Sequence, residues 1–106
     1  LTNSEVLIYN FETNTFSKKF QSGMKEYKVK TKNQGLADIL KDGSMMVEEY
    51  EYGRIVFFNS SGELEWEFIN KAKNGKIFIL EWSRIITNDI LIRKLNKIIQ
   101  NTKCTN

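Results

Sequence analysis

The sequence of 106 residues contains no histidine and a single cysteine, Cys104. Without histidine, the chain lacks the side chain that most often serves as general base, proton shuttle or metal ligand. One cysteine can form neither an intrachain disulfide nor a cysteine-based metal site. No apolar run approaches the ~20 residues that a membrane-spanning helix needs. The sequence therefore indicates no metal site, no cofactor and no membrane span.

The charge of the chain is only mildly basic. Sixteen lysines and arginines stand against 13 acidic residues, a net charge of +3, and the lysines are scattered along the sequence. A nucleic-acid-binding surface typically gathers its basic residues on one face. We therefore predict no nucleic-acid partner, and a basic binder using Lys28, Lys30 and Lys32 is the least favoured functional interpretation.

The clearest structural signal is a β-hairpin in the middle of the chain. Arg54–Asn59 and Glu63–Ile69 are rich in residues that favour strands, and Gly62 suits the positive φ of a short hairpin loop. The second run alternates, which predicts a half-buried strand with an acidic outer face. Its apolar positions are Leu64, Trp66 and Phe68.

Three further strands are predicted before residue 33. Glu5–Asn10 and Thr15–Phe20 flank a polar turn and read as a hairpin. Gly23 interrupts the pattern, and Glu26–Lys32 then alternates with lysines on one face. Lysines on one face of a strand are typical of a protected sheet edge, which we favour over an anion site.

Two more strands flank Asp42-Gly43, which is a strong local hairpin signal. Gln34–Leu40 precedes this turn and Ser44–Tyr52 follows it. Within the second strand, Glu48 and Glu49 are adjacent, so their side chains should point to opposite faces of the sheet. They therefore cannot act together as an acid–base pair.

The last two elements differ in period. Asn74-Gly75 should open a final strand, Lys76–Ile86. Residues 88–101 have helical spacing, with Asn88 as N-cap, and we expect this amphipathic helix to pack on the sheet. Residues 102–106 form a tail. The apolar stripe of the helix consists of Leu91, Ile92, Leu95, Ile98 and Ile99.

These elements predict an all-β, antiparallel protein with a C-terminal helix. The run Val6–Asn10 resembles Ile55–Asn59 at an offset of 49 residues, and a repeat of this length suggests the blades of a β-propeller. In that arrangement residues 1–87 form about two partial blades, and residues 34–69 form one complete blade.

Residues 34–86 resemble the C-terminal blades of the arylsulfotransferase-like propeller family. The resemblance is carried by Gln34–Leu40, Asp42-Gly43, Gly53-Arg54-Ile55, Trp66-Glu67-Phe68 and Trp82-Ser83-Arg84. It implies a propeller fold and, in active members, sulfuryl transfer that uses histidines in a central funnel. This chain has no histidine, and Gln34 stands where such blades often begin with one.

We therefore expect no catalysis from this chain alone. The resemblance implies instead a scaffold with a possible sulfate or aryl ligand, because arginines can hold such oxyanions through paired hydrogen bonds. The alternative for each arginine is an ion pair with a glutamate on a neighbouring strand. The candidate ligand-binding residues are Gln34, Arg54, Trp82 and Arg84.

Two functional interpretations remain ahead of nucleic-acid binding. In the first, the chain is a non-catalytic piece of an arylsulfotransferase-like propeller, whose partners are other blades. In the second, it is a self-associating all-β interaction module. Unpaired sheet edges favour association in both.

Overall fold

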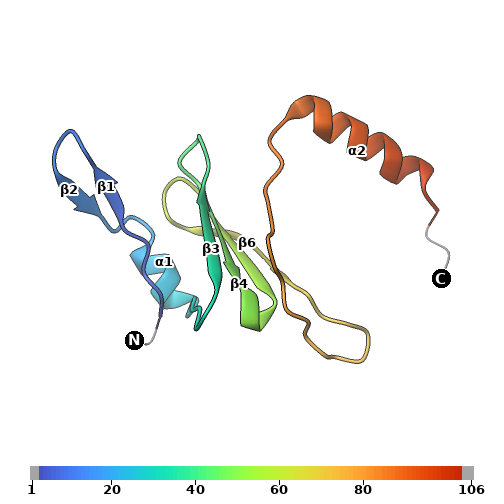
Figure 1. Ribbon diagram of the computed structural model, residues 1–106, viewed down its shortest axis with the longest axis horizontal. Coiled ribbons are helices and arrows are strands. Elements are labelled where there is room, and N and C mark those ends of the chain that lie inside the picture. The colour runs from blue at the N-terminus through green and yellow to red at the C-terminus, as the bar shows by residue number, and fades with distance from the viewer. Residues whose placement is uncertain (1–2, 104–106) are drawn as a thin grey trace.

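The computed structural model describes residues 3–103 and shows six strands, two α-helices and a short 3₁₀ turn in this part of the chain (Figure 1). The strands are β1 (Ile8–Asn10), β2 (Thr15–Ser17), β3 (Gly35–Ile39), β4 (Met45–Glu49), β5 (Arg54–Phe58) and β6 (Leu64–Ile69). The helices are α1 (Gln21–Glu26) and α2 (Asp89–Asn101), and the 3₁₀ turn covers Tyr50–Tyr52.

The strands form two antiparallel sheets. β1 and β2 make a separate two-stranded hairpin, and the second sheet has the strand order β3-β4-β5-β6. The turns between neighbouring strands contain Gly43, Gly53 and Gly62, all with positive φ. The predicted hairpins before Ser17, around Asp42-Gly43 and around Gly62 are confirmed, with shorter strands than expected.

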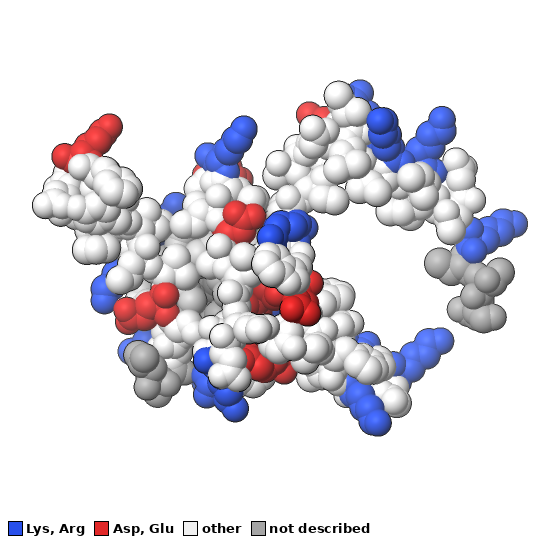
Figure 2. All heavy atoms as spheres, viewed as in Figure 1, with Lys and Arg blue, Asp and Glu red and all other residues white. Residues whose placement is uncertain are grey.

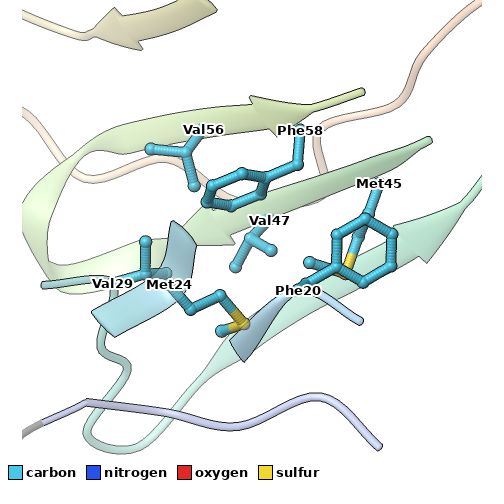
Figure 3. Close-up of a cluster of buried hydrophobic side chains, with 7 residues drawn as sticks. All are labelled: Phe20, Met24, Val29, Met45, Val47, Val56 and Phe58. Atoms are coloured by element: carbon cyan, nitrogen blue, oxygen red, sulfur yellow. The ribbon is translucent and has the colours of Figure 1, made fainter. Parts of the chain in front are cut away.

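The hydrophobic core covers one face of the four-stranded sheet (Figure 3). From the sheet it takes Met45, Val47, Val56 and Phe58, which alternate with residues on the other face. Helix α1 and the loop after it lie over these side chains and add Phe20, Met24 and Val29. A Cβ on Gly23 would lie 2.7 Å from both the Phe58 ring and the Gly62 carbonyl oxygen. Gly23 therefore allows α1 to approach the sheet closely.

The prediction of a strand at Glu26–Lys32 is wrong. Glu26 ends α1, and the amides of Tyr27 and Val29 donate to the carbonyls of Gly23 and Met24. Lys28 between them is left-handed, with φ 52°, as is common just after a helix. The alternating apolar and lysine residues belong to a segment that leaves the helix and passes beside the core. Among the described residues, no strand pairs with this segment.

Strand β6 is present, but it is not half-buried as predicted. Trp66 and Phe68 are 39% and 48% exposed. A bulge at Phe57 and Phe58 places Leu64 opposite Phe58 and Trp66 opposite Phe57. Leu64 therefore packs against the core, whereas Trp66 stacks on Phe57 at a ring distance of 5.1 Å on the other face. The bulge could not be seen in a strictly alternating sequence.

The predicted strand Lys76–Ile86 is also wrong. Asn74-Gly75 does form a tight turn, with the Ala72 amide donating to the Lys76 carbonyl at 2.8 Å. Beyond it, the part of the segment that the structure describes has a single bridge, between Lys71 and Ile77. The chain then runs without strand pairing, and Ser83 N–H donates to a Glu48 carboxylate oxygen at 2.6 Å.

Helix α2 begins where it was predicted, with the Asn88 side chain accepting from the Leu91 amide. The structure differs from the prediction that this helix packs on the sheet. α2 lies away from the sheet (Figure 1), open space separates the two in the space-filling view (Figure 2), and none of its residues is buried. Part of the predicted tail, residues 104–106, lies outside the described residues.

The antiparallel, mainly β class with a C-terminal helix is confirmed. β3 to β6 follow one another as a four-stranded meander over the residues predicted as a complete blade. In the described part of the chain the sheet does not close on itself. Its assignment as a propeller blade therefore stays a prediction.

Candidate functional site

The four predicted ligand-binding residues do not form one site. Gln34 and Trp82 line a cleft of about 360 Å³ beside the start of β3. Arg54 lines a separate cleft of about 410 Å³, and Arg84 lines neither of them. We call the first the acidic cleft and the second the basic cleft, after the charged residues that line them.

The two clefts are related through neighbouring residues of β4. Glu48 lines the acidic cleft and Glu49 lines the basic cleft. Both carboxylates are buried, and their side chains take partners on different sides, as predicted from strand alternation. One strand therefore places a buried carboxylate on each face of the sheet.

The acidic cleft combines aromatic rings with carboxylates. Its walls include Gln34, Leu36, Glu48, Tyr50, Glu81 and Trp82. Glu48 accepts from the Ser83 amide, which fixes the turn at Trp82, a residue with φ 62° and an exposed ring. Two carboxylates and no cation line the cleft, so its charge opposes binding of the sulfate that Gln34 and Trp82 were expected to help hold.

Arg84 interacts with its immediate neighbours. Its guanidinium lies over the Trp82 ring, 5.5 Å from the centroid, and donates to the Ser83 carbonyl at 2.8 Å. This is a cation–π contact at an exposed position, worth about 0.5–1 kcal/mol. Arg84 thus stabilises the turn at Trp82. Its described contacts include no ion pair with a glutamate, which was the alternative prediction.

Arg54 has the partner that the alternative interpretation predicted. Its Nε donates to the buried carboxylate of Glu49, its second guanidinium nitrogen lies 3.6 Å from Glu67, and a third donates to the Tyr27 carbonyl at 3.2 Å. The hydrogen bond that Arg54 donates to Glu49 raises the pKa of Arg54 above its ordinary value, against the opposing effect of burial. Arg54 therefore holds Glu49 and the Tyr27 backbone in place, and it also lines the basic cleft.

Sequence reasoning missed the other members of the basic cleft. Lys28 and Lys30 lie in its wall with Tyr52, Ile69 and Ile77. The Lys30 amide donates to Glu49 at 2.6 Å, which places this residue beside the sheet. The alternating lysines of 28–32 were the available signal, but a strand would have put them on an open edge rather than beside Arg54.

Neither cleft carries a recognisable catalytic arrangement in the described residues. These residues contain no group of three or more His, Cys, Asp and Glu side chains that could hold a metal ion. Glu48 and Glu49 point to different faces and have separate partners, so no acid–base pair forms. The described helices include none with the length and apolarity needed to cross a membrane.

Comparisons of the chain with protein-family models, with curated proteins and with solved structures give no significant match. The resemblance to arylsulfotransferase-like propellers therefore stays a prediction.

Proposed function

We propose that this chain is a non-catalytic interaction module that associates with a second copy of itself through helix α2. The observation that carries the proposal is the helix: thirteen residues with an apolar stripe, none of them buried. Isolated helices of this length are marginal in water, because most helical stability comes from packing an apolar face. The stripe of α2 therefore requires an apolar surface to cover it.

A surface of the right kind lies on the four-stranded sheet. Trp66 and Phe68 are exposed on the face opposite the core, and Ile55 lies across from Phe68 in the β5–β6 pairing. Scattered exposed apolar residues are ordinary, but a contiguous apolar patch marks an interaction site. This patch borders the free edge of the sheet, because β6 is the last strand in the order.

Charge favours a second copy as the partner. Helix α2 carries Arg93, Lys94 and Lys97 against one acid, Asp89. The β6 edge carries acids only. They are Glu65 and Glu67 in β6, with Glu63 just before the strand, and Glu67 lies 3.6 Å from Arg54. Complementary charges favour the docking of a basic helix on an acidic edge. The extended segment before Asp89 holds α2 away from its own sheet (Figure 1), so the matching surface is that of another copy.

Light scattering across a concentration range tests this proposal. The wild-type chain should show a mass that rises to a discrete multimer. Ile98→Gln should weaken association about tenfold, since removing one buried apolar side chain from an interface costs roughly 1.5 kcal/mol or more. Ile90→Gln is the matched control, because Ile90 lies outside the stripe and is 62% exposed against 61% for Ile98.

A monomer at all concentrations would contradict the proposal and favour α2 folding back on its own sheet. Equal weakening by both substitutions would contradict the assigned helix face. A trimer or tetramer would support a closed ring of blades, and a dimer would support reciprocal exchange of α2 alone.

A second candidate is the arylsulfotransferase-like interpretation, in which the chain is a scaffold fragment that meets other blades. It is supported by the four-stranded meander of β3 to β6, which is the strand topology of a propeller blade. Mixing the chain with a polypeptide carrying further blades would test it. A compact complex that forms with the added blades, without exchange of α2 between two copies of this chain, would favour this candidate.

A further inference from the structure

We propose that the basic cleft binds amphiphilic anions: small molecules with one acidic group on an apolar or aromatic body. This site is independent of the association proposed above, because the cleft involves Glu49 and Arg54, whereas the proposed docking patch lies on the other face of the sheet. The argument rests on the charge balance of the cleft and on its apolar wall.

The charge balance of the cleft is positive. Three cations, Lys28, Lys30 and Arg54, and one anion, Glu49, line it. A second anion, Glu67, lies 3.6 Å from Arg54, so the cations still outnumber the anions. Arg54 neutralises Glu49 through its Nε, and Glu49 also accepts from the Lys30 amide. The described contacts include no ion pair for the ammonium group of either lysine. Two cations in one concave surface therefore lack a counter-charge, which a bound anion would supply.

The cleft is held in shape by the contacts of its charged residues. Glu49 is buried and joins Arg54 of β5 to the amide of Lys30. The Arg54 guanidinium also donates to the Tyr27 carbonyl, next to the left-handed Lys28. The segment with both lysines is thus tied to the sheet at two points. A site organised before binding loses less entropy when the ligand arrives.

The remaining wall is apolar. Tyr52, Ile69 and Ile77 line the cleft and are each more than a third exposed. A cleft of about 410 Å³ is within the size range of small-molecule sites. An apolar body would cover these side chains while the acidic group meets the lysines. An inorganic ion would use the charges but leave the apolar wall exposed.

Three naphthalene probes of similar shape separate these contributions. They are 2-naphthoate, 2-naphthylmethanol and 2-naphthylmethylammonium. In NMR titrations of the full chain, 2-naphthoate should bind most tightly and shift the amides of residues 28–30, 52–54 and 77. The neutral probe should bind about tenfold more weakly, because a hydrogen bond to a charged group contributes roughly 1.5 kcal/mol or more. The cationic probe should bind most weakly.

The variants keep the fold intact. Lys28→Gln with Lys30→Gln removes both unpaired charges and should weaken 2-naphthoate binding about tenfold, with little effect on 2-naphthylmethanol. Lys94→Gln with Lys97→Gln removes the same charge from α2 and should leave binding unchanged. Arg54 is not substituted, because its loss would leave Glu49 buried without its partner.

Several results would overturn the proposal. They are no binding of 2-naphthoate at millimolar concentration, equal binding of the three probes, or equal weakening by both lysine pairs. Inorganic sulfate that binds as tightly as 2-naphthoate would show that the apolar wall takes no part. A variant that changes the multimer mass without changing the probe affinity would bear on the association through α2 and not on the basic cleft.

Discussion

Two regions of the molecule differ in how their apolar side chains are buried. One is the four-stranded sheet with α1, and the other is the segment from Asn70 to Lys103. The first has a buried core that includes Phe20, Met24 and Phe58, and leaves Trp66 and Phe68 exposed on its other face. The second, which we call the C-terminal arm, exposes large apolar residues such as Phe78, Trp82 and Ile98. Similar side chains therefore stabilise the fold in one region and remain available for contact in the other.

Stability and interaction therefore depend on different regions of this chain. Core side chains gain free energy from burial within one copy. Polar contacts tie the arm to the sheet region: Asn70 N–H donates to the Gly53 carbonyl at 2.8 Å, Leu80 N–H to the Tyr50 carbonyl at 3.3 Å, and Ser83 N–H to Glu48 at 2.6 Å. The helix beyond these contacts gains its packing from a partner in our proposal. Substitutions in the two regions should therefore have unlike effects.

The largest contrast is expected between two phenylalanines. Phe58→Ala removes a fully buried ring from the core and should lower the free energy of unfolding by about 3–5 kcal/mol. Phe78→Ala removes a ring that is half exposed on the arm and should cost less than about 1 kcal/mol. Urea denaturation followed by fluorescence measures both. Similar costs would mean that the arm is packed as well as the core.

The two adjacent glutamates should also behave differently. Glu49→Gln removes the charge that faces Arg54 and should lower the free energy of unfolding by about 3 kcal/mol, because it leaves a partly buried charge without its partner. Glu48→Gln keeps an acceptor for the Ser83 amide and should cost about 1 kcal/mol. Thermal unfolding of both variants measures the difference. A larger cost for Glu48→Gln would mean that the arm is integral to the fold.

Two glycines test how closely the arm meets the sheet. A Cβ on Gly53 would clash with the Phe78 carbonyl oxygen, whereas a Cβ on Gly75 would meet nothing within 4 Å. Both residues have positive φ, so both alanine variants carry a conformational cost of about 1 kcal/mol. Gly53→Ala should cost at least about 1 kcal/mol more. Equal unfolding free energies would mean that the arm leaves the sheet without cost.

The sheet and the start of α2 at Asn88 were predictable from the sequence, and the path of the arm before α2 was not. Asp42-Gly43 and Gly62 specify tight turns locally, so β3 to β6 follow from short-range patterns. The bulge at Phe57 and Phe58 and the helical turn around Gly23 depend on contacts between distant segments. So does the basic cleft, which joins Lys28 and Lys30 to Arg54. Asn74-Gly75 forms the tight turn that was expected, but among the described residues no strand lies beside Lys76–Ile86, so the predicted strand does not form.

The N-cap of α2 tests whether the helix is independent of the sheet. Asn88→Ala removes the side chain that accepts from the Leu91 amide and should lower helix stability by about 1 kcal/mol. We expect faster amide exchange across the first turn of α2, with the unfolding of the sheet unchanged. A matching loss of sheet stability would mean that α2 and the sheet form one cooperative unit.

The smallest effect concerns acid pH and lies in the turns of the sheet region. Hydrogen bonds from the Ser44 hydroxyl and amide lower the pKa of Asp42 below its ordinary value, and the Asn33 amide does the same for the pKa of Glu51. Because these pKa values are lower in the folded chain, their contribution to stability is present above the unfolded values, near 4. It is lost as the pH falls through the folded values. Carboxyl NMR titration should show the pKa of Asp42 rising in Ser44→Ala while that of Glu51 stays unchanged. An unchanged Asp42 pKa would mean that the Ser44 hydroxyl does not hold this turn, and that the glycine alone defines it.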